Sequence, residues 1–300
     1  IDKDLVDNTN YVENKSLLID RYYSPQLFER REKLMPFTWN YIYKNGKLFG
    51  DSLNNSKFSL TNNMIFSYPG YNEILTGNAD PTIKSNAKIY NKNVTVLEKL
   101  NQTNNYKNKI AAFASWDVFP YIINDKRSGI PVNAGYMEEL NIKTPVVDYI
   151  NKNQKRTPVI WENVRLDVYT HNLALEYIKK KRPKLVYIAY GETDDFAHGG
   201  KYDFYINSLN YTDNMIAELW GYVQSNKFYK DNTYFIITTD HGRGLMEDWS
   251  GHGTSKASWL AILGPNIEKT GLVEGEFFTN QIAETIMQIS KKSKTKIPTD

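Results

Sequence analysis

The chain has 300 residues, of which 41% are hydrophobic and 24% charged, so it can bury a large core and is not an intrinsically disordered sequence. Its formal net charge of +3 is small and its basic residues are spread along the chain, which gives no electrostatic reason to expect nucleic acid as the main partner. The absence of cysteine excludes disulfides, thiolate metal sites, a cysteine nucleophile and a formylglycine made from cysteine, and no apolar run approaches the ~18 residues of a membrane-spanning helix.

The first fifty residues are mostly polar and predict helices. Ser24-Pro25 resembles a helix N-cap followed by the first helical position, and Pro36 predicts the start of a second helix that ends at Asn45-Gly46. No apolar strand is expected before residue 58. After about residue 55 helix-like and strand-like patterns alternate, which predicts an α/β fold and not separate all-α and all-β parts.

The later elements follow from hydrophobic periodicity and from helix-ending residues. Strands are predicted at 109–116, 185–190, 234–239 and 259–263, and helices at 166–181, about 203–224 and about 279–290. The lysines that end the helix 166–181 suit the negative end of the helix dipole, and Pro183 stops it. The chain has no internal repeat and no firm domain boundary, so a single domain over residues 1–300 is predicted.

Three of the four histidines lie in two short segments that follow predicted strands. Asp194 and His198 are four residues apart after the strand 185–190, while Asp240-His241 follows the strand 234–239 and His252 lies on the loop beyond. Imidazole nitrogen and carboxylate oxygen are ligands that zinc takes in proteins, and this pattern predicts a divalent-metal site at the carboxyl edge of a parallel sheet. The alternative for each histidine is a buried ring that a backbone group satisfies.

The candidate nucleophile is Ser67, at the start of a short predicted helix in which Pro69 suits the first position and Gly77 the C-terminal stop. A helix N-terminus favours negatively charged oxygens, and a serine hydroxyl needs a base or a metal to become a nucleophile. The alternative is that Ser67 only caps the helix. His171 lies inside a predicted helix with no carboxylate at ligand spacing, so we expect it to be structural or exposed.

The order of these motifs along the chain resembles that of the alkaline phosphatase superfamily. The order is Ser-x-Pro opening a helix that ends in Thr-Gly, then Asp-x-x-x-His, then Asp-His-Gly, then a lone His. The nucleotide pyrophosphatase/phosphodiesterase and phosphopentomutase-like branches are the most similar, over roughly residues 58 to 290. The resemblance implies a three-layer α/β/α fold with a large, mostly parallel sheet. It also implies two divalent ions, with zinc expected first and manganese as the alternative.

Site roles follow from the resemblance by position. Ser67 matches the nucleophile, which also binds a metal; one ion would be bound by Asp194, His198 and His252, and the other by Asp240 and His241. The implied reaction is in-line attack on phosphorus, which gives a covalent phospho-enzyme that water then hydrolyses. Asn86, and less closely Asn91, matches an asparagine that holds a phosphoryl oxygen in many members.

The chain departs from the superfamily in one respect. Members begin with an apolar strand that ends in an Asp, often Asp-Gly, and that Asp completes the second metal site. This sequence contains no Asp-Gly, so we expect the first strand and its ligand to lie upstream of residue 1. Asp117, after the strand 109–116, is the alternative ligand.

The resemblance therefore predicts an exported (periplasmic or extracellular), metal-dependent hydrolase of small phosphate esters, either diesters or monoesters. Sulfatase activity is not expected, because Tyr71 stands where sulfatases carry an arginine and no cysteine is present. The alternatives are an inactive relative that binds a ligand in the same cleft and a phosphotransferase similar to phosphoglycerate mutases. Trp249, three residues before His252, is the best candidate for lining a substrate pocket.

Overall fold

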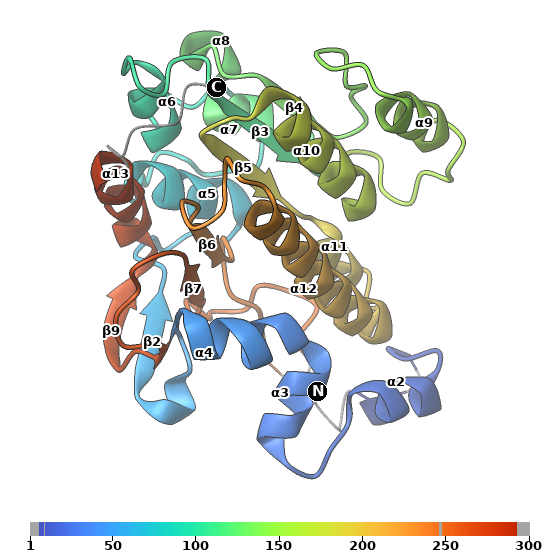
Figure 1. The fold of residues 1–300 in the computed structure, drawn as a ribbon. Helices are drawn as coiled ribbons and strands as arrows, with labels where there is room; N and C mark the ends of the chain where they lie inside the picture. Colours follow the sequence, from blue (N-terminus) through green and yellow to red (C-terminus); the bar gives the residue numbers. More distant parts are fainter. Residues whose placement is uncertain (1–5, 9, 246–247, 293–300) are drawn as a thin grey trace. The chain divides into compact units, whose positions relative to one another are not determined.

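A computed structural model describes residues 6–8, 10–245 and 248–292. The chain contacts divide it into two compact units, of which the first comprises residues 1–83 and 196–300 and the second residues 84–195. Helices and strands alternate along the chain (Figure 1), and the predicted α/β class with parallel strands is confirmed. The single domain over residues 1–300 stays a prediction.

The first unit contains a four-stranded and a two-stranded sheet. The larger sheet has the order β6-β7-β1-β8, and its strands are β6 (Phe235–Thr238), β7 (Leu260–Leu263), β1 (Lys47–Phe49) and β8 (Gly271–Leu272). Within it, β7 runs antiparallel to β1 and β6, whereas β1 and β8 are parallel. In the smaller sheet β2 (Ser56–Ser59) pairs in parallel with β9 (Gly275–Phe278). The expectation of no strand before residue 58 was wrong, because β1 has only three residues and one buried side chain, which is too short for a periodic signal.

The helices of this unit largely follow their sequence signals. They are α2 (Lys15–Tyr22), α3 (Leu27–Leu34), η1 (Phe37–Ile42), α4 (Tyr43–Asn45), η2 (Ser52–Asn54), α5 (Ser67–Thr76), α12 (Tyr202–Ser225), η4 (Thr279–Gln281) and α13 (Ile282–Lys292), with α11 (Glu192–His198) joining the two units. Pro36 caps η1 and Gly46 ends α4, as predicted. Ser24 lies before α3, where its hydroxyl accepts a hydrogen bond from the Gln26 amide at 3.2 Å, so the predicted N-cap was placed two residues early.

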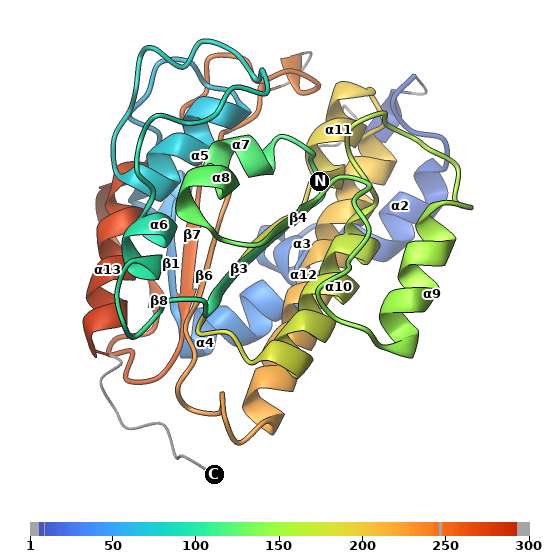
Figure 2. The same ribbon diagram turned by 90° about the horizontal axis from the view of Figure 1, so that it is seen from above.

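The second unit is built on a parallel sheet of order β4-β3-β5, with β4 (Val132–Ala134), β3 (Ile110–Ala114) and β5 (Leu185–Ala189). Its helices are α6 (Val96–Asn101), α7 (Phe119–Ile123), α8 (Asp125–Ser128), α9 (Pro145–Gln154) and α10 (Asp167–Lys181). Figure 2 shows α10 alongside this sheet, where it packs against β3 and β5. The predicted strand 109–116 and helix 166–181 correspond to β3 and α10.

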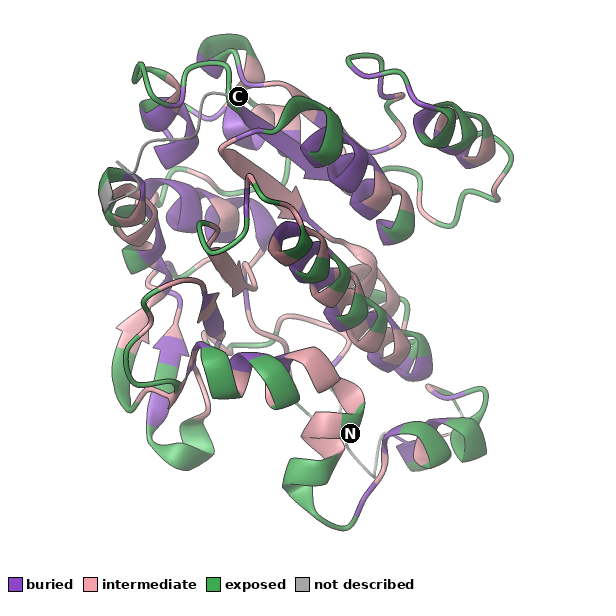
Figure 3. Cartoon of the chain, viewed as in Figure 1, coloured by how far each residue is buried: buried purple, intermediate pink, exposed green. Residues whose placement is uncertain are grey.

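One face of α10 supplies much of the core of this unit. Leu173 and Ala174 are fully buried and belong to a cluster with Phe113, Val147 and Tyr177. In Figure 3 the buried part of α10 faces the sheet and its exposed part faces away. Among the helices that the structure describes, none has both the length and the apolar character needed to cross a membrane.

Because Leu173 is fully buried in this cluster, Leu173→Ala should leave a cavity and lower the free energy of unfolding by about 3 kcal/mol. Val168→Ala on the same helix, at a position that is 48% exposed, should change it by less than about 0.5 kcal/mol. Urea denaturation of both variants measures the difference. Equal losses would show that α10 does not bury the face described here.

Candidate metal centre

Helix α11 carries two of the predicted metal ligands, Asp194 and His198, one turn apart. Asp167, at the start of α10, and Glu192, at the start of α11, each accept hydrogen bonds from backbone amides at the start of the other helix. Asp167, the first residue of α10, accepts hydrogen bonds from the amides of Gly191 at 2.7 Å and Glu192 at 3.1 Å. The Glu192 carboxylate in turn accepts from the Asp167 amide at 2.7 Å. The start of α11 is therefore tied directly to the start of α10, which limits how its ligands can move.

The same arrangement changes the acidity of Asp167, whose side chain also accepts a hydrogen bond from the Ser115 hydroxyl at 2.5 Å. Burial, and then the negative charge of Glu192, raise the pKa of Asp167 from 3.8 to about 7, against the opposing effect of its hydrogen bonds. A carboxyl group that is this deeply buried holds its proton at a pH at which an exposed aspartate has lost it.

Asp194, His198 and His252 come together as predicted. One metal-binding atom from each lies within 4.8 Å of the others, and the Nε2 atoms of His198 and His252 are 3.0 Å apart. Two imidazole lone pairs at this distance repel each other unless a proton or a cation lies between them. A carboxylate oxygen with two imidazole nitrogens is a ligand set that suits a divalent ion such as zinc and leaves further positions open.

A second group of donors surrounds His241, which follows β6. The Nδ1 atom of His241 lies 2.8 Å from the carbonyl oxygen of Gly242, and because a carbonyl only accepts hydrogen bonds, Nδ1 carries the proton. In the neutral ring Nε2 then presents a lone pair, 3.3 Å from the Ser67 hydroxyl and 3.4 Å from Asp240 Oδ2. A carboxylate oxygen and an imidazole nitrogen that face each other are of the ligand types that divalent cations accept.

The two donor groups are neighbours. The rings of His241 and His252 have centroids 4.0 Å apart, and those of His252 and His198 are 4.9 Å apart. Ser67 and His241 are almost fully buried, whereas His198 is exposed. The residues that the sequence analysis assigned to two ions therefore lie side by side, with solvent reaching one end of the cluster.

Ser67 does not act as a helix cap. It is the first residue of α5, and the N-cap is Phe66, which makes no side-chain capping bond. Gly77 ends the helix in the left-handed conformation, as predicted. A glycine that the sequence analysis missed allows the helix to reach the site: a Cβ at Gly70 would lie 2.1 Å from the carbonyl oxygen of Asp240. Glycine inside a predicted helix is the sequence signal for such a close approach.

The predicted phosphoryl-binding asparagines lie in the second unit. Asn86 is exposed in an irregular segment, and its role stays a prediction. Asn91 is buried, and its backbone and side-chain amides donate to the carbonyls of Tyr121 and Ile122 at 2.9 and 3.2 Å, which is a structural role. Asp117, the alternative metal ligand, makes an ion pair with Lys88 at 2.6 Å.

His171 and Trp249 are both buried. The Nδ1 atom of His171 lies 2.9 Å from the Tyr190 hydroxyl, in agreement with the structural role expected for it. Trp249 belongs to a hydrophobic cluster in which its ring makes edge-on contacts with Tyr11 and Tyr202. The expectation that Trp249 lines a substrate pocket was therefore wrong, because the ring is only 3% exposed and its large apolar area is buried in the core.

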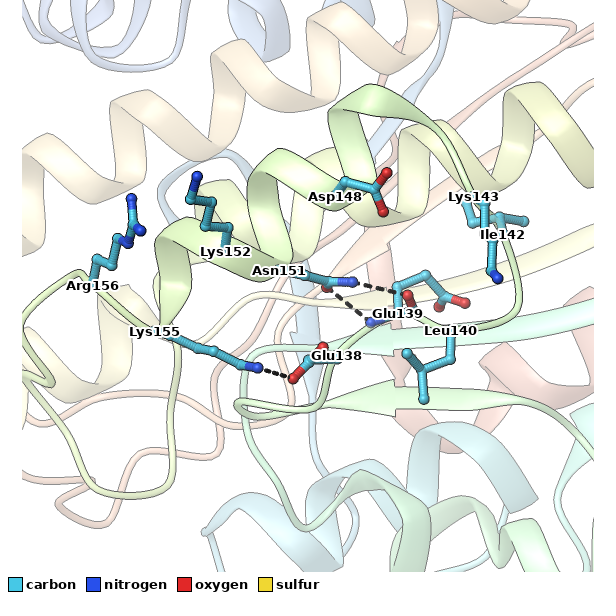
Figure 4. Close-up of a pocket in the computed structure, with 10 residues that line it drawn as sticks. All are labelled: Glu138, Glu139, Leu140, Ile142, Lys143, Asp148, Asn151, Lys152, Lys155 and Arg156. Atoms are coloured by element: carbon cyan, nitrogen blue, oxygen red, sulfur yellow. Dashed lines mark hydrogen bonds and ion pairs between the residues drawn. The ribbon is translucent and has the colours of Figure 1, made fainter.

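A hollow of about 470 Å³ lies in the second unit, around α9 (Figure 4). It is lined by Glu138, Glu139, Leu140, Ile142, Lys143, Asp148, Asn151, Lys152, Lys155 and Arg156. Two of these side chains are paired within the hollow, Lys155 with Glu138 by an ion pair. None of the predicted site residues lines it, so it is separate from the donor cluster.

If the histidine pair binds a divalent ion, His252→Ala should lower the affinity for zinc by more than about 100-fold, because even changes outside the ligand shell cost 10–100-fold. Isothermal titration of the metal-stripped protein measures this. His171→Gln serves as the control, because His171 is buried and hydrogen-bonded to Tyr190 and is not one of the predicted ligands. The zinc affinity of this variant should match that of the parent. Equal affinities for His252→Ala and the parent would exclude His252 as a ligand.

The raised pKa of Asp167 has a consequence for stability. The folded protein binds this proton more tightly than the unfolded chain does, so the stability that Asp167 contributes falls as the pH rises from about 4 to about 7. The free energy of unfolding of the parent minus that of Asp167→Asn should decrease over this range, since asparagine does not titrate. Urea denaturation at several pH values measures it, and parallel curves for the two proteins would contradict it.

Known proteins share a sequence pattern and the fold with this chain. The family model described as Sulfatase matches residues 143–285. No curated protein matches the chain significantly. Solved structures with a similar fold include the lipoteichoic acid synthase LtaP from Listeria monocytogenes, at 14% identity and a TM-score of 0.60 over 85% of this chain and 65% of that one.

Two further structures are similar. A protein in the alkaline phosphatase superfamily from Vibrio parahaemolyticus has 13% identity and a TM-score of 0.54, over 85% of this chain and 60% of that one. The phosphonate monoester hydrolase SpPMH from Silicibacter pomeroyi has 12% identity and a TM-score of 0.53, over 88% of this chain and 69% of that one. The chain thus spans less than two thirds of the first two of these proteins, and at such identities the likeness concerns the fold. Taken together, the chain is similar in fold to proteins of the alkaline phosphatase superfamily, and its segment 143–285 matches the Sulfatase family model.

Proposed function

We propose that this protein is a metal-dependent hydrolase of phosphate esters, with Ser67 as its nucleophile. The observation that carries the proposal is the 3.3 Å approach of the Ser67 hydroxyl to His241 Nε2, beside Asp240. Hydrolysis of sulfate and phosphate esters is the chemistry of the superfamily. Phosphate is the proposed substrate class, because the chain has no cysteine and Tyr71 stands in the position of the sulfatase arginine.

The donor groups divide between two ions. Asp194, His198 and His252 would hold one, and Asp240, His241 and the Ser67 oxygen the other. Bound divalent ions, zinc or manganese, stabilise negative charge on the attacking and leaving oxygens of an in-line displacement. The proposed contribution of the protein is position: the Ser67 hydroxyl lies 3.3 Å from His241 Nε2, and the His241 ring lies beside that of His252.

Ser67 performs the first half of the reaction. Its oxygen forms a bond to phosphorus, and the P–O bond to the alcohol breaks with the electron pair leaving on the alcohol oxygen. The proton of the Ser67 hydroxyl passes to that oxygen by way of solvent, so the alcohol leaves neutral. Since Ser67 is the first residue of the ten-residue helix α5, the backbone N–H groups of the first turn and the positive end of the helix dipole favour the phosphoryl oxygens. Water then displaces Ser67 from phosphorus and regenerates the free hydroxyl.

A second candidate is transfer of the phosphoryl group to an alcohol in place of water. One of the similar structures is named a lipoteichoic acid synthase, and an acceptor alcohol could occupy the solvent-accessible end of the cluster near His198. An added alcohol such as glycerol that increases the release of p-nitrophenol and forms a phosphoglycerol product would favour transfer.

We also propose that the protein works outside the cytoplasm, as many members of the superfamily do.

Ser67→Ala should lower kcat for p-nitrophenyl phosphate or bis-(p-nitrophenyl) phosphate by more than about 1000-fold, because no covalent intermediate can form. Zinc should still bind to the histidine pair. The assay is run on metal-stripped protein with zinc or manganese added back, with the exposed Ser225→Ala as a control of parental activity.

Two results would contradict the proposal. One is turnover by Ser67→Ala close to that of the parent, which would reduce Ser67 to a structural residue. The other is a kcat/KM for p-nitrophenyl sulfate above that for both phosphate esters, which would reverse the assigned substrate class.

A further inference from the structure

The turn that leads into Ser67 adopts an unfavourable backbone conformation. Ile65 has a φ of +53°, in the left-handed region that β-branched residues rarely occupy. Such a conformation is strained and persists only where the surroundings hold it. Here the Asn62 side-chain oxygen accepts hydrogen bonds from the amides of Met64 at 3.0 Å and Ile65 at 3.1 Å. Asn62 therefore holds the backbone two residues before the nucleophile.

The Asn62 side chain is fixed in its turn by Glu73. Glu73 Oε2 accepts hydrogen bonds from the Asn62 backbone amide at 2.9 Å and from its side-chain Nδ2 at 2.7 Å. One end of the Asn62 amide group thus bonds to Glu73 and the other to the turn. Asn62 is almost fully buried, so water does not compete for either bond. The orientation of the amide group is determined by its partners.

Glu73 is itself completely buried, six residues after Ser67 on α5. Its other oxygen, Oε1, accepts from the amide and hydroxyl of Thr61 at 2.8 and 3.0 Å, and also from the hydroxyl of Thr279. Five donors therefore surround one carboxylate inside the protein. Hydrogen bonds to a charged group are stronger than those between neutral groups, so this network holds α5 firmly against the preceding segment.

We propose that Glu73 and Asn62 are positioning residues for the nucleophile, a role that rests on the proposed function of Ser67. Glu73 fixes Asn62, Asn62 holds Ile65 in its left-handed conformation, and the backbone of Ile65 sets the direction in which α5 starts. Neither side chain touches the reacting atoms.

The position of α5 leaves little tolerance. Its Gly70 lies against the carbonyl of Asp240 so closely that a Cβ would stand 2.1 Å from that oxygen. The Ser67 hydroxyl must also stay 3.3 Å from His241 Nε2. A displacement of about 1 Å at a reacting group can cost about 100-fold in rate. A network that fixes the start of α5 therefore affects catalysis even though it lies outside the metal centre.

Two variants separate positioning from general stabilisation. Asn62→Ala removes all three hydrogen bonds of the side-chain amide group but leaves the bonds of Glu73 to Thr61 and Thr279. Thr279→Val, at an equally buried position, removes one donor to Glu73 without touching the turn. We expect kcat for p-nitrophenyl phosphate to fall about 100-fold in Asn62→Ala, with KM and zinc affinity within about threefold of the parent. Thr279→Val should keep kcat within about twofold.

A second measurement does not depend on turnover. Hydrogen–deuterium exchange of the segment 61–67 should speed up in Asn62→Ala, because the amides of Met64 and Ile65 lose their acceptor, and should match the parent in Thr279→Val.

Glu73→Gln is the more direct change and should act like Asn62→Ala, since an amide places a donor against the donors of Asn62. Asn62→Ala keeps the test decisive where Glu73→Gln gives no folded protein.

The proposal would be overturned if Asn62→Ala kept the parental kcat, or if both variants lost activity only in proportion to their loss of folded protein. Unchanged exchange in the segment 61–67 would overturn it as well. A parent protein that hydrolyses no phosphate ester would instead refute the proposed function. In that case faster exchange in Asn62→Ala would still show that the network holds the turn.

Discussion

The convergence of imidazole and carboxylate groups from separate segments is the constraint on which the centre of this protein depends. His198 and His252 turn two imidazole nitrogens toward each other at 3.0 Å, and Asp240 lies 3.4 Å from the Nε2 atom of His241. Nδ1 of His241 donates to the Gly242 carbonyl, so its Nε2 turns toward Asp240 as an acceptor. Nitrogen and carboxylate groups gathered in this way suit positive charge, either a shared proton or a cation, and the fold must bring them together from separate segments.

The means by which the fold does this are backbone contacts outside the centre. Asp167 and Glu192 cap each other's helices and so fix the start of α11. Gly70 lets α5 lie against the end of β6, and Glu73 with Asn62 holds the strained turn before Ser67. Each is a buried polar or backbone interaction with defined directions, and such interactions determine orientation more sharply than apolar packing does. The chemistry of the site depends on residues that do not themselves belong to it.

The two buried carboxylates that hold these helices, Glu73 and Asp167, have different surroundings. Glu73 and Asp167 are both fully buried, but their partners differ. Five donors surround Glu73, whereas Asp167 faces the second carboxylate of Glu192, and its pKa rises. One carboxylate thus anchors the nucleophile helix through hydrogen bonds alone, and the other anchors the ligand helix at the expense of a pH-dependent stability.

The residues of the candidate site and most of its scaffold could be predicted from the amino-acid sequence. Strand and helix periodicity located β3, β5, β6 and α10, because amphipathic patterns are local, and the motif order grouped Ser67 with Asp194, His198, Asp240, His241 and His252. It could not find β1, which is too short to show a period, nor decide that Trp249 is packed in the core and that Asn91 is structural. Only the tertiary structure decided these points, together with the roles of Gly70, Glu73 and Asp167. Each depends on contacts between residues far apart in the chain, and the free energy of such contacts leaves no trace in local composition.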